Sequence, residues 1–572
     1  MLILSIAIQH DSGAALINDG KIIAAVNEER LNRKKLYWGI PERSIEEVFK
    51  IAGVKPSDVE FVTFSNLMSG NKIDNFTAAE RDFNTKVLQS LSSIGIASVL
   101  TGTEPGIKLI RAIFTTIKHK NFKRTIQYLG SIGVKAPVKF IEHHESHAAS
   151  AYYTSGWNEC LVVTSDAAGD GYCSKVFVAK DGKMELIQQI PFYHSIGYYY
   201  SYITHICGFR EGHHEGKITG LAAYGNPKET FLIFQKEVSY NPGKFSTENR
   251  GRYLWPEINY LKKRLKGYSK KDIAAGIQYH LETNMVSYIK DAIKKTGQKR
   301  IALAGGVFAN VKLNQRIREI EGVEGVFIHP HMGDGGLAVG AGLYLWAKES
   351  LSQGKYKHLE RLKDVYFGPS YSKEEIEQVL KKEGLNYYQP DCIETEIANL
   401  LAQGKVIARF AGRMEYGPRA LMNRSILYQA TDVTVNDWLN KKLKRTEFMP
   451  FAPVILEENA PYFLKDYDER SSHTAQFMTI TYDVTERCKK EAPAIVHVDG
   501  TARPQIITKE TSNPSARKIL EEYKKLTGLS ILINTSFNMH EEPIVCSPED
   551  AVRAFKLGEL DILAIEDFMV GE

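Results

Sequence analysis

The N-terminal part of the chain begins with short apolar runs separated by polar turns. Residues 2–8 are apolar, and residues 14–17 and 22–26 form two further apolar runs on either side of an Asp19-Gly20 pair. An Asp-Gly pair between apolar runs is a strong signal for a β-hairpin. We therefore predict a strand, a polar turn at residues 10–13 and a hairpin.

The same pattern returns from residue 160 onwards. Apolar residues 161–164 precede a polar turn at 166–171, and residues 176–178 lead into an Asp181-Gly182 pair. Self-similarity on this scale indicates two related halves. Such halves are typical of the duplicated α/β architecture of actin-like ATPases, in which carboxylate-bearing turns of both halves face one nucleotide cleft. The alternative is coincidence, because strand–turn–strand patterns are common.

The pattern changes twice more along the chain. Residues 70–135 are helical in pattern and form an insertion, and residues 350–375 are polar with glycine and proline, which indicates a domain boundary. The remainder alternates helices and strands and indicates a second α/β domain. We predict an N-terminal domain at 1–355 and a C-terminal domain at 365–572.

Composition excludes several classes of protein. A length of 572 residues requires at least two domains, since a single core rarely exceeds ~250–300 residues. Contents of 43% apolar and 25% charged residues exclude a disordered, collagen-like or coiled-coil chain. The net charge of +5 is weak for this length, so no nucleic-acid partner is expected. Because the chain has no membrane-length apolar run, no leader-like N-terminus and no Cys-x-x-Cys pair, we expect a cytoplasmic protein without a membrane partner.

One histidine pair has the spacing of a metal site. His143 and His147 stand four residues apart in a segment of small, helix-favouring residues. On a helix this spacing puts both imidazoles on one face, where they can bind one ion. Asp166 and Asp334 lie in strand-end turns that an actin-like fold directs into its cleft, so we predict them as further ligands. Two histidines with carboxylates suit iron, manganese or zinc. The alternative is a histidine pair that binds nothing.

Two more N-terminal segments carry groups suited to a phosphate or a carbonyl. Lys217 lies between glycines, and Gly305-Gly306 joins a short apolar strand to a helix predicted to start near Val311. Paired glycines let a ligand approach the backbone, and a helix N-terminus favours anions. For Lys217 the alternative is a histidine-rich loop that caps a helix.

The C-terminal part concentrates basic residues between 409 and 445. Four arginines fall between 409 and 424, where glycines and Pro418 interrupt any helical face. Guanidinium groups bind phosphates through paired hydrogen bonds, and lysines add charge. Residues 534–538 are predicted to follow a strand and offer short donors. We predict a phosphate-rich ligand pocket. An RNA-binding face is the alternative, but the aromatic residues that such faces use are not interleaved.

Five motifs together resemble a known family. They are, in chain order, His10-Asp11-Ser12-Gly13-Ala14-Ala15, His143-x-x-x-His147, Gly305-Gly306-Val-Phe-Ala-Asn310, Arg413-x-Glu-Tyr-Gly-Pro-Arg419-Ala-Leu and Asn534-Thr-Ser-Phe-Asn538. The chain resembles the NodU/CmcH carbamoyltransferases, which include the tobramycin, cephamycin and nodulation-factor O-carbamoyltransferases. The resemblance covers nearly the whole chain and is weakest over residues 70–135.

The resemblance implies both a fold and a reaction. The fold is α/β, with a duplicated actin-like (ASKHA, Kae1-like) N-terminal domain and a YrdC/Sua5-like C-terminal domain. The C-terminal domain is expected to form carbamoyl adenylate from carbamoyl phosphate and ATP with Mg²⁺. The N-terminal domain is expected to transfer the carbamoyl group to a hydroxyl of a small molecule. Iron(II) is the expected metal for this step, and manganese and zinc are the alternatives. The insertion at 70–135 is the expected source of the acceptor pocket. A homodimer is a possible partner arrangement that the resemblance leaves undecided.

The resemblance also implies roles for particular residues. The expected catalytic residues are His10, Asp11 and Lys217, and the expected metal ligands are His143, His147, Asp166 and Asp334. The residues expected to bind nucleotide or carbamoyl adenylate in the N-terminal domain are Gly169, Gly220, Gly305, Gly306 and Asn310. Those expected to bind carbamoyl phosphate and ATP in the C-terminal domain are Arg413, Arg419, Arg424, Lys444, Arg445, Asn534, Ser536 and Asn538.

Two positions raise questions of their own. His10 is the candidate general base, because it lies at the cleft turn and an imidazole titrates near neutrality; the alternative is a structural histidine. Met422 stands where the family usually has glycine before Asn-Arg-Ser. A larger side chain there would alter the shape of the nucleotide pocket.

Two other functions compete with this interpretation. A tRNA threonylcarbamoyl-type transferase would use the same chemistry on RNA, but the weak net charge argues against it. An actin-like sugar kinase or nucleotide sensor would explain the duplicated halves but not the arginine-rich second domain.

Overall fold

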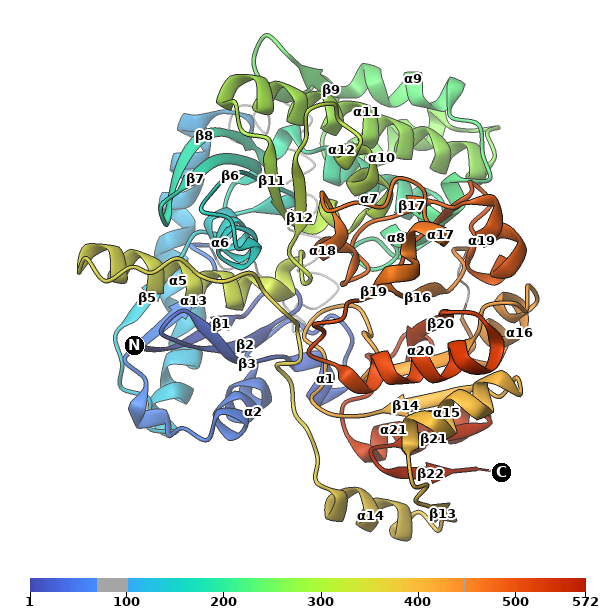
Figure 1. The fold of residues 1–572 in the computed structure, drawn as a ribbon. Helices are drawn as coiled ribbons and strands as arrows, with labels where there is room; N and C mark the ends of the chain where they lie inside the picture. Colours follow the sequence, from blue (N-terminus) through green and yellow to red (C-terminus); the bar gives the residue numbers. More distant parts are fainter. Residues whose placement is uncertain (69–100, 446–447, 572) are drawn as a thin grey trace. The chain divides into compact units, whose positions relative to one another are not determined.

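The computed structural model describes residues 1–68, 101–445 and 448–571, with only the backbone for residues 113–121 (Figure 1). The chain forms two compact units. Unit 1 comprises residues 1–22, 38–41 and 53–361, and unit 2 comprises residues 23–37, 42–52 and 362–572. The sequence pattern does not indicate that two N-terminal stretches group with the C-terminal unit.

The first two sheets have the same topology. Their strand orders are β3-β2-β1-β4-β5 and β8-β7-β6-β11-β12. In each sheet the first strand in the chain pairs antiparallel with the second and parallel with the fourth, and the fourth pairs parallel with the fifth. This equivalence confirms the predicted α/β duplication. The strands are β1 Leu2–Ala7, β2 Gly13–Asn18, β3 Lys21–Asn27 (whose first two residues belong to unit 1), β4 Phe61–Phe64, β5 Val138–Phe140, β6 Glu159–Gly169, β7 Tyr172–Lys180, β8 Lys183–Pro191, β11 Arg300–Ala304 and β12 Gly325–Ile328.

The two predicted hairpins turn in the same way. Asp19 and Gly20 have φ of 48° and 80°, and Asp181 and Gly182 have φ of 49° and 79°. Two successive residues with positive φ are the signature of the type I′ turn, which matches the twist of the strands it joins. The Asp-Gly pairs are therefore placed where the backbone requires them.

Two helices that follow the last strands of the two sheets pack against each other in unit 1. They are α6 (His143–Ser155), after β5, and α13 (Leu337–Ser352), after β12. A Cβ atom on Gly340 would lie 1.8 Å from the carbonyl oxygen of Ser146. Only a glycine therefore allows this close approach.

The remaining elements of unit 1 lie mainly between β8 and β11. The described part of the predicted insertion at 70–135 contains the helix α5 (Glu104–Ser131), and residues 69–100 lie outside the description. The further elements are α7 Ile196–Ile206, α8 Glu215–Ala222, α9 Lys228–Glu237, β9 Val238–Asn241, β10 Ser246–Asn249, α10 Trp255–Arg264, α11 Lys270–Thr296 and α12 Val311–Arg318.

Unit 2 is built on one mixed sheet of eight strands. Its order is β13-β22-β21-β14-β15-β20-β16-β19. The strands are β13 Tyr387–Tyr388, β14 Ile407–Phe410, β15 Arg424–Gln429, β16 Ala452–Leu456, β19 Gln505–Ile507, β20 Ile531–Ser536, β21 Ile562–Ile565 and β22 Phe568–Val570. The helices are α1 Glu28–Asn32, α2 Glu42–Ala52, α14 Lys373–Lys382, α15 Ile393–Ala402, α16 Val435–Lys442, α17 Ala460–Phe463, α18 Ser472–Ala475, α19 Glu486–Glu491, α20 Pro514–Thr527 and α21 Pro548–Leu557, and a short hairpin pairs β17 Tyr482–Asp483 with β18 Thr501–Ala502.

Both faces of this sheet are covered. Neighbouring strand residues alternate between two apolar cores, as Ile426 and Leu427 do, because successive side chains in a strand point to opposite faces. Helices α15 and α20 lie together over one face (Figure 1). Residues of α14, α16 and α21 belong to the other core. The result is the separate α/β domain that the sequence predicts.

An arginine anchors an N-terminal stretch within unit 2. The guanidinium of Arg33 donates to the carbonyl oxygens of Pro543 and Ile544 at 2.7 and 2.8 Å, and its Nε lies 3.3 Å from a carboxylate oxygen of Asp550. Nearby, Arg30 donates to the carbonyl of Gly417 at 2.6 Å. These contacts explain why residues 23–37 group with a domain that begins far along the chain.

Two predictions from composition concern cysteines and membranes. All six cysteines are free thiols. Within the described part of the chain, no helix combines the length and the apolar character that crossing a membrane requires.

Candidate functional site

The two predicted histidine ligands lie at the start of α6. The helix begins at His143 because the side chain of Glu142 caps it, accepting from the backbone N–H of Glu145 at 2.9 Å. His143 and His147 are therefore one turn apart and are 1% and 0% exposed. His144 points away, to the hydroxyl of Thr164 and the carbonyl of Tyr172. Burial lowers the pKa of His144 to about 3, so it is a neutral core residue.

The two predicted carboxylate ligands meet these imidazoles. Oδ2 of Asp166 lies 3.2 Å from Nε2 of His147 and 3.7 Å from Nε2 of His143. Oδ1 of Asp334 lies 3.5 and 3.8 Å from the same two atoms. We call His143, His147, Asp166 and Asp334 the quartet. The structure thus brings together all four residues that the sequence analysis grouped.

The quartet fits a metal ion. Its ligand atoms all lie within 4.8 Å of one another. Donors that surround one ion at ~2.1 Å are ~3–4 Å apart, which matches the histidine–carboxylate distances above. Among the described residues, the buried Nε2 atoms of His143 and His147 have no hydrogen-bond partner, although the carboxylates are close. A shared cation would satisfy both nitrogens and both carboxylates at once.

A glycine makes room for one of these imidazoles. A Cβ atom on Gly169 would lie 2.0 Å from Cδ2 of His143 and 2.3 Å from Cγ. No side chain can share that space. Gly169 was predicted to bind nucleotide, and its position at the end of β6 gives it a direct part in the shape of the quartet.

The charges in the quartet stabilise one another. Burial disfavours the charged form of His143, but the carboxylates of Asp334 and Asp166 outweigh it and raise its pKa to about 9. Burial favours the neutral acid of Asp166, yet the two imidazoles lower its pKa well below the usual value. Without a cation, the site therefore holds protons that a metal ion would displace.

Paired glycines hold Asp166 in place. The backbone N–H of Gly306 donates to Oδ2 of Asp166 at 3.2 Å. Gly305 has φ of 106°, and a Cβ there would lie 2.2 Å from the carbonyl oxygen of Ser165. The register of β6 shifts between Ser165 and Gly169, and such a bulge re-aims a side chain. The predicted glycine turn thus touches the quartet directly.

His10 lies in the turn after β1. Its Nδ1 is 3.5 Å from Oδ2 of Asp11, and its ring meets Trp38 and His213 edge-on at 6.2 Å. Burial disfavours the imidazolium, but Asp11 and, more weakly, Asp334 raise the pKa of His10 to about 9. A cation on the quartet would offset the contribution of Asp334 and leave that of Asp11.

Other predicted N-terminal residues lie on α8 and α12. Lys217 and Gly220 are on α8, and the Lys217 ammonium lies 5.9 Å from the ring of Phe209. The amide of Asn310 caps α12 through the N–H of Leu313 at 3.0 Å and donates to Gln278 at 2.8 Å. The predicted nucleotide roles of these residues stay predictions.

Two residues behind His143, Asp170 and Asn66, were not predicted from the sequence. Asp170 accepts from the backbone N–H groups of Leu67, Met68 and His143 at 2.6–2.8 Å, and the amide of Asn66 lies 3.0 Å from Nδ1 of His143. Binding a metal through Nε2 requires a proton on Nδ1, so the Asn66 amide would then present its oxygen. The available signal for Asp170 was its Asp-Gly pair at a strand end. Asp170 and Asp11 both have positive φ in equivalent turns.

In unit 2, three of the predicted C-terminal residues lie together. Arg445 donates to the hydroxyl of Thr535 at 3.0 Å, to the carbonyl of Ser536 at 2.6 Å and to Oδ1 of Asn538 at 3.0 Å. Lys444 is exposed beside it, with φ of 58°. Arg445 thus orders the segment after β20 that the sequence analysis singled out.

Two predicted arginines contact backbone carbonyls. Arg424 is fully buried, stacks 3.6 Å above the ring of Phe410 and donates to the carbonyl of Ala411 at 2.7 Å. Arg413 donates to the carbonyl of Phe367 at 2.8 Å. These bonds stabilise the loop between β14 and β15, and a phosphate-binding role for these arginines, for Arg419 in the same loop and for Lys444 stays a prediction.

A buried carboxylate and a strained methionine shape the same loop. Oε1 of Glu415 accepts from the backbone N–H groups of Leu421, Asn423 and Arg424 at 2.7–3.1 Å. Met422 lies in this turn with φ of 84° and is fully buried. Positive φ favours glycine, so the backbone explains the glycine that the family carries here.

Two predicted strand boundaries were wrong. The turn expected at residues 166–171 is confined to 170–171, because β6 continues to Gly169 and β7 begins at Tyr172. The second boundary is at residue 534. Asn534 was expected to follow a strand, but β20 continues to Ser536 because its residues pair with β15 as far as Ser425. Asn534 is therefore buried within the sheet. Its Nδ2 donates to Oε1 of Gln505 at 2.6 Å and to the carbonyl of Ala420 at 3.2 Å.

Unit 2 has a polar hollow that was not predicted from the sequence. Its polar lining includes Thr481, His497, Thr501 and Arg503, and the apolar side is Phe451 and Ile495. The backbone N–H of His497 donates to the carbonyl of Thr501 at 2.9 Å. The lining residues come from several separate stretches between 449 and 503, so no single sequence motif predicts the hollow.

Comparisons with known proteins match both parts of the chain. The family model described as "Carbamoyltransferase N-terminus" matches residues 2–343, and the one described as "Carbamoyltransferase C-terminus" matches residues 398–572. Among relatives, "Nodulation protein NolNO" of Sinorhizobium fredii is 32% identical over 98% of this chain and 79% of its own length. "Nodulation protein NolO" of Bradyrhizobium diazoefficiens is 34% identical over 75% of this chain and 78% of its own length.

A solved structure shows a weaker likeness. The chain is similar to HypF of T. kodakarensis, with a TM-score of 0.33 and 10% identity over 62% of this chain and 48% of that chain. A TM-score of this size assigns no fold.

Proposed function

Because the chain belongs to the carbamoyltransferase family, we propose that this enzyme activates carbamoyl phosphate with ATP and transfers the carbamoyl group to a hydroxyl of a sugar or other natural product. The match of both family models to consecutive parts of the chain carries this proposal. The quartet in unit 1 and the basic residues of unit 2 supply groups that suit the transfer step and the activation step.

The quartet is the proposed metal site. His143 and His147 would bind through Nε2, and Asp166 and Asp334 through one oxygen each. Iron(II) is the proposed ion, with manganese or zinc as alternatives, since imidazole and carboxylate ligands suit all three. A bound divalent cation supplies a Lewis acid at this site.

The proposed proton acceptor in the transfer step is His10. Asp11 lies 3.5 Å from Nδ1 and fixes that nitrogen as the protonated one, which leaves Nε2 to take the proton of the attacking hydroxyl. This role requires the neutral form of His10, and a cation on the quartet would favour that form by offsetting the charge of Asp334. Lys217 is proposed to bind the carbamoyl carbonyl or a phosphate through its ammonium group.

The proposed activation step uses unit 2. ATP and carbamoyl phosphate are both strongly anionic. The basic groups proposed to bind them are Arg419, in the loop between β14 and β15, and Lys444 and Arg445, which follow α16. Glu415 and Arg424 keep the loop in shape through backbone contacts. The product, carbamoyl adenylate, has a good leaving group for the transfer step.

The test separates the two steps. Purified protein is mixed with ATP, Mg²⁺ and carbamoyl phosphate, and carbamoyl adenylate is sought by mass spectrometry. Sugars, nucleotide sugars and aminoglycosides are then screened for a gain of about 43 Da, the mass of a carbamoyl group that replaces a hydrogen. Wild-type adenylate formation in Arg419→Ala would contradict the activation site, and full transfer in His143→Ala would contradict the metal site. ATP turnover that does not depend on carbamoyl phosphate would favour a kinase or sensor, and a tRNA gel shift would favour the tRNA alternative.

A further inference from the structure

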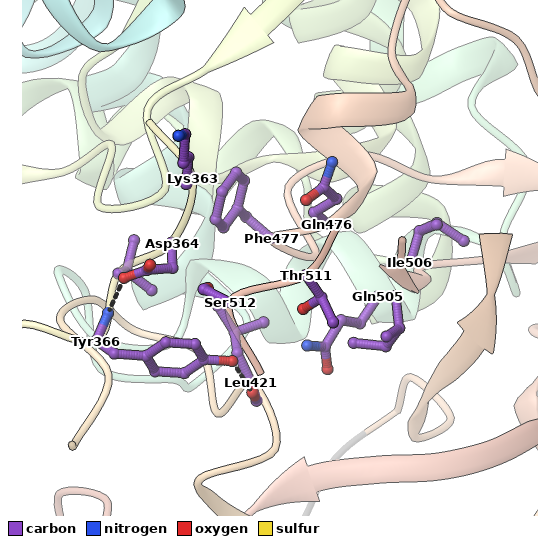
Figure 2. Close-up of a pocket in the computed structure, with 12 residues that line it drawn as sticks. Lys363, Asp364, Tyr366, Leu421, Gln476, Phe477, Gln505, Ile506, Thr511 and Ser512 are labelled. Carbon is purple, nitrogen blue, oxygen red and sulfur yellow. Dashed lines mark hydrogen bonds between the residues drawn. The ribbon is translucent and has the colours of Figure 1, made fainter. Parts of the chain in front are cut away.

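The pocket of unit 2 that Figure 2 shows is too small for a substrate. Its cavity volume is about 20 Å³, which is room for about one water. Lining groups bind one another there: the hydroxyl of Tyr366 donates to the carbonyl of Leu421 at 2.8 Å, and Oδ1 of Asp364 accepts from the backbone N–H of Tyr366 at 3.0 Å. Buried charged groups that bear on the proposed reaction lie instead in unit 1, behind the quartet.

The first turns of α5 pack against the turn between β6 and β7. Glu104, Ile107 and Arg111 follow one another at helical spacing and therefore share one face of the helix. Ile107 is fully buried, and the hydroxyl of Tyr172 donates to Oε2 of Glu104 at 3.0 Å. Gly171 has φ of 96°, and a Cβ atom there would lie 2.7 Å from Cγ2 of Ile107. The helix of the insertion is therefore seated directly on this turn.

Arg111 binds the two residues that hold the start of α6. Its Nε donates to the carbonyl oxygen of Asp170 at 2.7 Å, and its Nη2 donates to Oε1 of Glu142 at 2.9 Å. Asp170 in turn accepts from the backbone N–H of His143 at 2.8 Å through Oδ2. Glu142 directly precedes His143 and caps α6 by accepting from the N–H of Glu145 at 2.9 Å. One guanidinium therefore fixes a group on each side of His143.

A second cation and an aromatic ring complete the surroundings of this guanidinium. Glu142 is 4% exposed, and Nζ of Lys175 lies 3.1 Å from the same carboxylate oxygen that Arg111 contacts. The guanidinium carbon of Arg111 and Nζ of Lys175 lie 4.7 and 4.8 Å from the centre of the Tyr172 ring. Such close contacts of charged groups in a buried place hold the side chains in one arrangement.

From these contacts we propose that Arg111 is a positioning residue for the quartet. It acts through Asp170 and Glu142, which set the place of His143, and it thereby ties the insertion helix to the metal site. The inference rests on the metal site of the proposed function. Groups that orient metal ligands from behind typically change metal affinity ~10–100-fold when they are replaced.

The test is a cobalt(II) titration of the metal-free, full-length protein. Visible absorption of bound cobalt(II) reports the ligand geometry, and competition with a chelator of known affinity gives the dissociation constant. The variants are Arg111→Met, which removes the charge and both donors, and Arg111→Lys, which keeps the charge but loses the fork that reaches both acceptors. The matched control is Lys108→Met, at an exposed position on the same helix. Thermal unfolding of the metal-free proteins checks that each variant is folded.

We expect Arg111→Met to weaken cobalt(II) binding ten- to hundredfold and to change the absorption spectrum, and Arg111→Lys to weaken binding by a smaller factor. Lys108→Met should match the wild type. Wild-type affinity and spectrum in folded Arg111→Met would overturn the inference, and if that variant does not fold, the same result in Arg111→Lys would do so. An equal loss in Lys108→Met would also overturn it, because the effect would then belong to any charge on the helix. In these cases the wild type still binds cobalt(II) and the proposed metal site stands, whereas no cobalt(II) binding by the wild type would overturn the metal site and this inference with it.

Discussion

Gly169, at the end of β6, packs against the imidazole of His143, because a Cβ atom on Gly169 would lie 2.0 Å from Cδ2 of His143. We predict that Gly169→Ala displaces the imidazole and lowers the metal content of the protein at least tenfold by elemental analysis. The matched control is Gly130→Ala on α5, where a Cβ meets nothing within 4 Å. Carbamoyl adenylate formation, which belongs to unit 2, should persist. A fully metallated Gly169→Ala protein would contradict this account.

The metal-free protein should lose stability as the pH rises. The pKa of His143 is raised from 6.5 to about 9 in the folded state. Its contribution is therefore complete below pH 6.5 and is lost as the pH rises through about 9. At ~1.4 kcal/mol per pKa unit, the free energy of unfolding should fall by ~3 kcal/mol over this range.

Chemical denaturation of chelator-treated protein at several pH values measures this change. Asp334→Asn removes the largest charge that raises the pKa, so the pH dependence should shrink in that variant. A metal-loaded sample should lack it, because the ion replaces the proton. Equal pH dependence in all three samples would show that the charges of the quartet are not coupled.

His10→Gln should separate the two steps of the proposed reaction. Removing the imidazole should lower carbamoyl transfer ~10²–10⁴-fold, the usual contribution of general acid–base catalysis. Formation of carbamoyl adenylate should be unchanged. The readouts are acceptor carbamoylation and adenylate, both by mass spectrometry. If transfer is unimpaired, His10 is a structural residue and the base lies elsewhere.

Arg445→Lys should impair activation. Lysine keeps the charge but loses the planar fork that reaches Thr535, Ser536 and Asn538 together. We expect adenylate formation to fall at least tenfold with the fold intact. Arg487→Lys is the control, because that arginine is half exposed and forms a salt bridge with Glu491 at 2.9 Å. Comparable loss in both variants would point to a general effect of the substitution.

Met422 should invert the usual ranking of alanine and glycine. Its side chain is buried in the sheet core, so either small residue should destabilise unit 2 by ~2–5 kcal/mol. At φ of 84°, however, alanine keeps the left-handed strain of ~1–2 kcal/mol and glycine relieves it. Met422→Gly should therefore unfold at a higher temperature than Met422→Ala. The opposite order would show that the turn relaxes when the side chain is removed.

The elements that sequence predicts best are those with a local cause. The Asp-Gly hairpins follow from positive φ at Asp19 and Asp181, and the histidine pair follows from the period of a helix. Asp166 and Asp334 both come from the second half: Asp166 lies within β6, and Asp334 lies just before α13, the helix that packs against α6.

What sequence does not predict depends on partners far along the chain. Asp170 accepts from the backbone N–H of His143 and also from those of Leu67 and Met68, which lie about a hundred positions earlier in the chain. The contacts of Arg424 with the ring of Phe410 and the carbonyl of Ala411 depend on the tertiary fold, and its phosphate-binding role stays a prediction. The length of a strand also depends on distant residues, because β20 continues past Asn534 where it pairs with β15.

The grouping of residues 23–37 and 42–52 with unit 2 has a consequence for synthesis on the ribosome. These stretches leave the ribosome early, but the rest of their unit begins more than 300 residues later. At ~5–20 residues per second, they wait tens of seconds for their partners. Unit 2 therefore cannot complete co-translational folding before nearly the whole polypeptide has emerged, and chaperones would have their longest opportunity to act on this N-terminal segment.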